Sequence, residues 1–110
     1  MKINIASNEI IHFIGIGGIG MSGLAQIMNN MGFAIQGSDL SKNKNTERLI
    51  KKGIKVYFGH NQKNLKKTTM VVISSAIKET NKELMAAKNK KLAIFKRGEM
   101  LANIVSLKKN

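Results

Sequence analysis

The sequence predicts an α/β fold, a Rossmann-like doubly wound parallel sheet of about five strands with helices on both faces. Strand-like and helix-like segments alternate along the chain, glycines lie where they meet, and a glycine-rich loop follows the first strand-like segment. Because connections between parallel strands are right-handed, the expected strand order is 3-2-1-4-5.

The first half of the chain predicts three strands and two helices. Residues 10–14 form a β-branched run that ends at a glycine. Apolar residues then recur every three or four positions over 19–31, which predicts an amphipathic helix with Gly32 just beyond its end. Alternation over 33–39 predicts a second strand. A short helix with Thr46 as its N-cap, ending at Gly53, and a third strand over 54–58 follow in order.

The second half continues the same alternation. The polar stretch 59–69 is expected to hold one helical turn around 64–67, and residues 70–74 are apolar enough for a central strand buried on both faces. Asn81 is a suitable N-cap for the helix that follows it. The last expected elements are a helix over 82–89, a fifth strand over 92–95 and a terminal helix over 99–107. Together these elements predict a single domain over residues 1–110.

The net charge raises the possibility of a nucleic-acid partner. The chain has 19 Lys and Arg against 6 Asp and Glu, a formal charge of +13. The lysines are scattered in short pairs, however, and neither Tyr57 nor the four Phe residues lie within a basic cluster. We therefore expect no nucleic-acid partner.

Several classes of protein are excluded by composition. The absence of Cys excludes disulfides, thiolate metal sites and cysteine nucleophiles, and is consistent with a reducing compartment. The apolar runs fall well short of the ~20 residues that a membrane-spanning helix needs. The expectation is a cytoplasmic domain without membrane insertion.

The glycine-rich loop carries the main chemical signal. Gly15, Gly17 and Gly20 satisfy G-x-G-x-x-G between a predicted strand and a predicted helix. In this pattern Gly15 permits the tight turn, Gly17 lets a diphosphate approach the backbone, and Gly20 lets the helix pack closely on the strand. Gly18 removes one more side chain from the path of the phosphate. The helix N-terminus then offers N–H groups and a positive dipole end to an anion.

An acid follows the loop at a suitable interval. Asp39 lies 19 residues after Gly20, at the end of the second predicted strand, where an acid commonly accepts hydrogen bonds from a ribose or a base. The pattern therefore predicts a nucleotide diphosphate site, and NAD(P) and a UDP-sugar are equally possible on these grounds. The alternative is a glycine-rich turn that binds nothing, with Asp39 capping a loop.

A longer stretch resembles a known family. Residues 11–23, IHFIGIGGIGMSG, are very similar to the opening of Mur ligases, the family that builds the peptide of peptidoglycan. The resemblance covers about residues 10–104, and its further matches are Gly37-Ser38-Asp39, Gly59-His60, Ser74-Ser75-Ala76-Ile77, Asn81 with Glu83, and Arg97 with Glu99-Met100-Leu101.

The resemblance implies that this domain binds UDP-N-acetylmuramate, with the diphosphate on the glycine-rich loop and Asp39 toward the uridine. The substrate-binding residues that it implies are Gly15, Gly17, Gly18, Ile19, Gly20, Met21, Ser22, Asp39, His60, Ser74, Ser75, Ala76 and Arg97. His60 and Ser74 follow predicted strands, so they are expected where the crevice opens, and Arg97 is suited to pair with a phosphate or carboxylate.

Each of these side chains also has a purely structural interpretation. His60 can be a loop histidine without a ligand, Ser74 and Ser75 can bond backbone groups at a strand end, and Arg97 can be a solvated cation beside Glu99. His12, inside a strand, is expected to be a hydrogen-bonded packing residue. The methionines expected in the core are Met21, Met28 and Met31.

The sequence lacks the parts that catalysis in this family requires. It has no G-x-x-x-x-G-K-[ST] loop, and its six acids show no metal-ligand clustering. No catalytic residue, metal or cofactor is therefore expected in this chain. The resemblance implies a longer ATP-dependent ligase that joins L-alanine to UDP-N-acetylmuramate, with ATP and Mg²⁺ bound by further domains. This chain alone is then inactive.

Two other functions remain open. An NAD(H)-binding regulatory or dehydrogenase domain would share the loop and Asp39, but would leave 74–77 and 97–101 unexplained. A basic nucleic-acid-binding protein is supported only by the charge.

Overall fold

The computed structural model describes residues 5–6 and 8–108. It contains a five-stranded parallel sheet of order β3-β2-β1-β4-β5, which confirms the predicted fold and strand order. The strands are β1 Ile10–Ile14, β2 Ala34–Asp39, β3 Lys55–Phe58, β4 Met70–Ile73 and β5 Ala93–Lys96. The helices are α1 Ile19–Asn30, α2 Lys44–Lys51, the 3₁₀ helix η1 Gln62–Leu65, α3 Lys82–Asn89 and α4 Arg97–Lys108. A single domain over 1–110 stays a prediction, since 1–4, 7, 109 and 110 lie outside the described residues.

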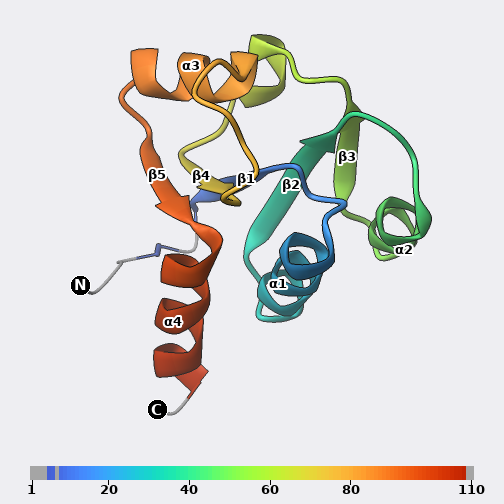
Figure 1. Ribbon diagram of the computed structural model, residues 1–110. Helices are drawn as coiled ribbons and strands as arrows, with labels where there is room; N and C mark the ends of the chain where they lie inside the picture. The colour runs from blue at the N-terminus through green and yellow to red at the C-terminus, as the bar shows by residue number, and fades with distance from the viewer. Residues whose placement is uncertain (1–4, 7, 109–110) are drawn as a thin grey trace.

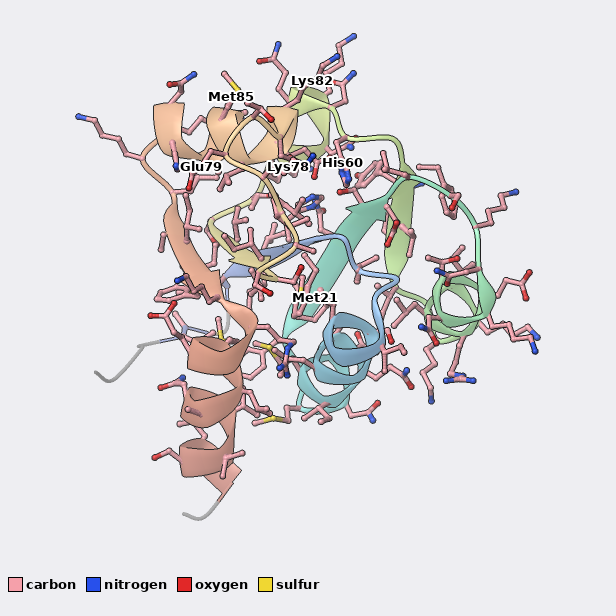
Figure 2. All side chains as sticks on the ribbon, viewed as in Figure 1. Met21, His60, Lys78, Glu79, Lys82 and Met85 are labelled. Carbon is pink, nitrogen blue, oxygen red and sulfur yellow. The ribbon has the colours of Figure 1, made fainter. Side chains whose placement is uncertain are left out.

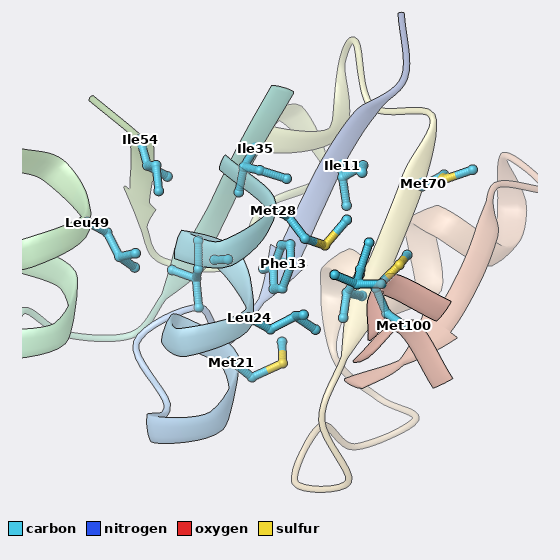
Figure 3. Close-up of a cluster of buried hydrophobic side chains, with 14 of the residues drawn as sticks. Ile11, Phe13, Met21, Leu24, Met28, Ile35, Leu49, Ile54, Met70 and Met100 are labelled. Carbon is cyan, nitrogen blue, oxygen red and sulfur yellow. The ribbon is translucent and has the colours of Figure 1, made fainter. Parts of the chain in front are cut away.

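Helices cover both faces of the sheet (Figure 1). α1, α2 and α4 pack on one face, where Phe13, Met28 and Leu49 belong to the larger apolar cluster (Figure 3). α3 and η1 cover the other face with a smaller cluster. Val71 and Val72 point to opposite clusters and are both fully buried, so β4 is a central strand as predicted.

The three methionines of α1 pack as expected. Met21 and Met28 are buried in the larger cluster, and Met31 packs against it from the end of the helix. Gly32 then has φ of +96°, the left-handed conformation predicted for the residue after the helix.

The helix caps bear out one prediction and correct another. Asn81 caps α3 by accepting hydrogen bonds from the N–H groups of Glu83 and Leu84, at 2.9 and 3.1 Å, as expected. The predicted N-cap Thr46 is wrong, because Asn43 takes that position. Asn43 Oδ1 accepts from the Thr46 N–H, and Thr46 Oγ1 accepts from the Asn43 N–H, both at 2.9 Å, so Thr46 is the third residue of a capping box.

α4 begins two residues earlier than predicted. The carboxylate of Glu99 accepts a hydrogen bond from the backbone N–H of Lys96 at 2.8 Å, which stabilises a helical turn that starts at Arg97. The first residue of α4 is therefore the arginine that the resemblance assigns to the substrate.

Candidate nucleotide-binding site

The glycine-rich loop joins the carboxyl end of β1 to α1. Gly15 has φ of +83°, so this residue makes the tight turn, as predicted. The N–H groups of Gly15 and Ile16 both donate to the carbonyl oxygen of Ser38, at 2.8 and 2.9 Å. The loop is thus held against the end of β2, the neighbouring strand.

Packing within the protein also requires glycine at position 17, and the predicted approach of a diphosphate there stays a prediction. A Cβ atom at Gly17 would lie 2.7 Å from Asp39 Oδ2 and 2.9 Å from Thr46 Cγ2. The side chains of Asp39 in β2 and Thr46 in α2 therefore leave no room for a side chain at position 17, with or without a ligand.

The nearest neighbour of Gly20 belongs to α4 and not to the strand on which it is predicted to let the helix pack. A Cβ atom at Gly20 would meet Cδ and Nε of Arg97 at 3.0 Å, so its neighbour is a side chain of α4. The close approach between loop and sheet occurs at Gly37, where a Cβ atom would lie 2.6 Å from Cβ of Ile16.

α1 starts with unpaired donors. The backbone N–H groups of Ile19, Gly20 and Met21 have no partner in the part of the chain that the structure describes. The N-cap Gly18 has no side chain to supply one, and the first turn contains no acid. The first internal bond runs from Ser22 N–H to the Gly18 carbonyl at 2.8 Å. This helix end combines free donors with a positive dipole, which is the arrangement that binds anions.

The side chains of this first turn point in different directions. Met21 is buried and is labelled in the first turn of α1 in Figure 2. Ser22 is buried as well, and its hydroxyl donates to the Ile19 carbonyl at 3.2 Å. Ile19 is 89% exposed. Of these predicted contact residues, Met21 offers a ligand its backbone N–H, whereas Ser22 has committed both of its donors to the helix.

Arg97 crosses the same helix end. Its guanidinium carbon would lie 3.3 Å from a Cβ atom at Gly20, and the side chain is half-buried. Within residues 5–6 and 8–108 its guanidinium makes no hydrogen bond or ion pair, so it is not paired with Glu99. A cation and three free N–H groups therefore converge on one place from α4 and α1.

The segment after β4 reaches the same region. Cδ1 of Ile77 lies 3.3 Å from the position of a Cβ atom at Gly15. Ser75, Arg97 and Glu99 are among the residues that line a pocket of about 300 Å³. Ser74 instead bonds within its own segment, since its Oγ accepts from Ala76 N–H at 3.3 Å. The structure thus brings the segment to the loop, and places Ser75 in the pocket.

Asp39 is bound to backbone groups on both of its oxygens. Oδ2 accepts from Gly17 N–H at 2.7 Å, and Oδ1 accepts from Leu40 N–H at 2.8 Å. Each oxygen retains a lone pair, so the predicted bond to a ribose or base stays a prediction. The structural interpretation, a carboxylate that caps the loop, describes these two bonds.

His60 lies at the carboxyl end of β3 and is hydrogen-bonded rather than free (Figure 2). Its Nδ1 lies 2.9 Å from Oγ of Ser38, and Ser38 Oγ donates to Oε1 of Glu83 at 2.5 Å. Ser38 therefore joins His60 to the glycine-rich loop, because its carbonyl accepts the two loop N–H groups.

Glu83 is the centre of a buried polar network. Oε1 accepts from His12 Nε2 at 2.7 Å as well as from Ser38. Oε2 accepts from Asn64 Nδ2 at 2.6 Å and from Asn61 N–H at 3.1 Å. His12 and Glu83 are both fully buried. The prediction that His12 is a hydrogen-bonded packing residue is confirmed.

These donors keep Glu83 ionised. Burial by itself raises the pKa of a carboxyl group, but the hydrogen bonds from His12, Ser38 and Asn64 outweigh it and lower the pKa of Glu83 from 4.5 to about 2. A buried carboxylate thus lies beside the end of β2, hydrogen-bonded to Ser38.

The role of Glu83 was not predicted from the sequence, although one signal was present. Glu83 shares a helix face with Ala86 and Ala87, three and four residues later, and both are buried. An acid on the buried face of a helix needs partners inside the protein, and a buried histidine on a strand is one.

The described residues contain neither a metal-ligand cluster nor a membrane-spanning helix. No group of three or more His, Cys, Asp or Glu side chains in that part of the chain could hold a metal ion. None of its helices has the length and apolar character needed to span a membrane.

Comparisons with known proteins agree with this fold and loop. A curated UDP-N-acetylmuramate–L-alanine ligase from Pelagibacter ubique is 66% identical over the whole chain, which spans 24% of that relative. One from Bartonella bacilliformis is 57% identical over 87% of the chain and 20% of its own length. The chain therefore spans about a quarter or less of the length of these relatives.

Solved structures give the same result. The UDP-N-acetylmuramate–alanine ligase of Thermotoga maritima matches with a TM-score of 0.87 and 30% identity, over 91% of this chain and 23% of its own. The UDP-N-acetylmuramate:L-alanyl-γ-D-glutamyl-meso-diaminopimelate ligase of Neisseria meningitides matches with a TM-score of 0.79 and 32% identity, over 84% of this chain and 30% of its own. The family model described as "Mur ligase family, catalytic domain" matches residues 10–109. The chain therefore belongs to the Mur ligase family.

Proposed function

We propose that this chain binds UDP-N-acetylmuramate and is the substrate-binding domain of a longer ligase that adds L-alanine to it. The observation that carries the proposal is the convergence of the unpaired guanidinium of Arg97 on the unpaired N–H groups of Ile19, Gly20 and Met21. A diphosphate placed there would receive a charge-assisted bond from the arginine and several backbone bonds.

The surroundings of this place favour a UDP-sugar over NAD(H). The diphosphate site lies between α1 and α4, and the pocket beside Arg97 also includes Ser75. A glycine-rich loop, Asp39 and an arginine at the diphosphate would suit either nucleotide, since both carry a diphosphate, but a dinucleotide gives no reason for the segment after β4. The names of the relatives specify the same UDP-sugar.

The reaction itself is proposed for the longer protein. The described residues do not fit ATP with Mg²⁺, because they include no cluster of potential metal ligands and the sequence has no phosphate-binding loop with lysine. ATP, Mg²⁺ and L-alanine are therefore assigned to other domains of a cytoplasmic enzyme. This chain holds the UDP-sugar and by itself catalyses no turnover.

Isothermal titration of the chain with three ligands tests the proposal. We expect saturable binding of UDP-N-acetylmuramate and none of NADH at the same concentrations. Because the chain carries a charge of +13, a short DNA duplex serves as a control for unspecific attraction of anions at two salt concentrations. Binding of NADH without binding of the UDP-sugar would refute the proposal, as would tight, steeply salt-dependent binding of the duplex alone.

A further inference from the structure

The hydrogen bonds behind His60 determine which of its ring nitrogens carries the proton. Glu83 is surrounded by four donors: His12 Nε2, Ser38 Oγ, Asn64 Nδ2 and the N–H of Asn61. A carboxylate in such surroundings acts only as an acceptor. The direction of every bond in this network therefore follows from Glu83.

Ser38 transmits this direction to His60. A hydroxyl group has one proton, and the proton of Ser38 Oγ is donated to Glu83 Oε1 at 2.5 Å. The contact of 2.9 Å between Ser38 Oγ and His60 Nδ1 must then be a bond that Nδ1 donates. Neutral His60 consequently carries its proton on Nδ1 and none on Nε2.

The unprotonated Nε2 of His60 faces solvent. No hydrogen bond to it occurs among the described residues, and no buried side-chain nitrogen or oxygen of this part of the chain lacks a partner. Nε2 is therefore in contact with solvent, although the side chain as a whole is only 13% exposed. The crevice edge at β3 presents a hydrogen-bond acceptor there, while the edge at α1 presents donors.

We propose that His60 is a specificity-determining residue that accepts a hydrogen bond from a neutral donor of the ligand, a hydroxyl group or a ring imide N–H, and that Ser38 and Glu83 are the positioning residues that keep Nε2 free of a proton. This extends the proposed function, since it divides the ligand between two sites. The phosphates lie at Arg97, and the uncharged part with its donors lies at His60.

The tautomers of the two histidines test the positioning network without any ligand. Gln36 Nε2 donates to the Asn64 carbonyl and, at 2.8 Å, to Nδ1 of His12. His12 is therefore expected with its proton on Nε2, the opposite of His60. Nitrogen NMR of the imidazole rings at about pH 8, above the ordinary histidine pKa of about 6.5, distinguishes the two forms. His60 protonated on Nε2 would overturn the inference.

The variant Ser38→Ala tests whether Ser38 controls the tautomer of His60. The variant removes the group that accepts from Nδ1 and leaves Glu83 Oε1, 3.6 Å from Nδ1, as the nearest acceptor. The population of the Nδ1 tautomer of His60 is therefore expected to fall while His12 keeps its own tautomer. The ring signal of His12 also reports whether the network and the fold are intact. A His60 that stays fully protonated on Nδ1 in a folded variant would show that Ser38 does not control it.

Binding of UDP-N-acetylmuramate to two variants of His60 tests the specificity role. His60→Gln places an acceptor oxygen near the position of Nε2 and should keep the affinity within about threefold, whereas His60→Leu should lose roughly tenfold. Equal affinities, or equal losses, in the two variants would contradict the role of acceptor. If the wild-type chain binds no UDP-sugar, the proposed function fails, and the tautomer experiment still decides on the network.

Discussion

Arg97→Met is expected to weaken the binding of UDP-N-acetylmuramate by roughly 10- to 100-fold, the equivalent of about 1.5–3 kcal/mol for a lost charge-assisted hydrogen bond. The guanidinium makes no ion pair within the described residues, so its loss leaves no protein carboxylate unpaired. The side chain lies beside the exposed Gly20 in the first turn of α1, and the fold should remain intact. Calorimetric titration measures the affinity.

The only other arginine of the chain provides a matched control. Arg48 lies exposed in the last turn of α2, and Arg48→Met removes the same charge and should leave the affinity nearly unchanged. Arg97→Lys keeps the charge without the planar fork and should lie between wild type and Arg97→Met. If both methionine variants lose affinity equally, the arginine contributes only through the net charge, and the proposed diphosphate site is wrong.

Glu83→Gln is expected to destabilise the fold by about 3–5 kcal/mol at neutral pH, because removing the charge from a buried, fully hydrogen-bonded carboxylate leaves donors without acceptors. The amide can accept from only two of the groups that now surround the carboxylate, and its own N–H₂ group faces the others. For a domain of this size the midpoint of thermal unfolding should fall by more than about 10 °C. Denaturant unfolding gives the free energy directly.

The effect of this variant should depend on pH in a defined window. The pKa of Glu83 in the folded protein lies below its value of 4.5 in the unfolded chain. The ionised carboxylate therefore makes its full contribution to the free energy of unfolding above about pH 4.5. This contribution amounts to about 3 kcal/mol. It is lost as the pH falls toward about 2, the pKa of Glu83 in the folded protein. The difference in stability between wild type and Glu83→Gln should therefore shrink over this range.

Glu79→Gln is the control for that window. Glu79 is 81% exposed and pairs with Lys88 on the surface, so its replacement should change neither the stability nor its pH dependence appreciably. A difference between wild type and Glu83→Gln that stays constant from neutral pH to pH 2 would mean that Glu83 is not ionised in the folded protein.

The sequence allowed the sheet order and the extent of several elements to be predicted because those signals are local. The helical period over 19–31 and the cap at Asn81 placed α1 to within one residue and the limits of α3 correctly. Thr46 was predicted as the N-cap of α2, whereas Asn43 takes that position, because both residue types cap helices. Only the reciprocal hydrogen bonds between the two residues show that Asn43 is the N-cap. Gly15 could be assigned to its tight turn because the spacing of the glycines in the loop is also a local signal.

The candidate site was harder to predict where it depends on tertiary contacts. The bond from Ser38 to Glu83 joins residues 45 positions apart, and the contact of His12 with Glu83 joins residues 71 positions apart. No period or spacing reports such pairs. The contact of Arg97 with Gly20 depends likewise on how α4 packs beside α1. The resemblance to Mur ligases supplied the residues, and the structure supplied their partners.

The central claim is that the N-terminus of α1 holds the diphosphate, and backbone amide NMR of the ¹⁵N-labelled chain tests it most directly. On titration with UDP-N-acetylmuramate, the amide signals of Ile19, Gly20 and Met21 are expected to show the largest saturable shifts, since these N–H groups have no partner elsewhere in the described residues. Saturable binding that leaves these three signals unchanged and shifts instead those of Lys63, Lys66 and Lys90, which line a separate basic pocket, would contradict it.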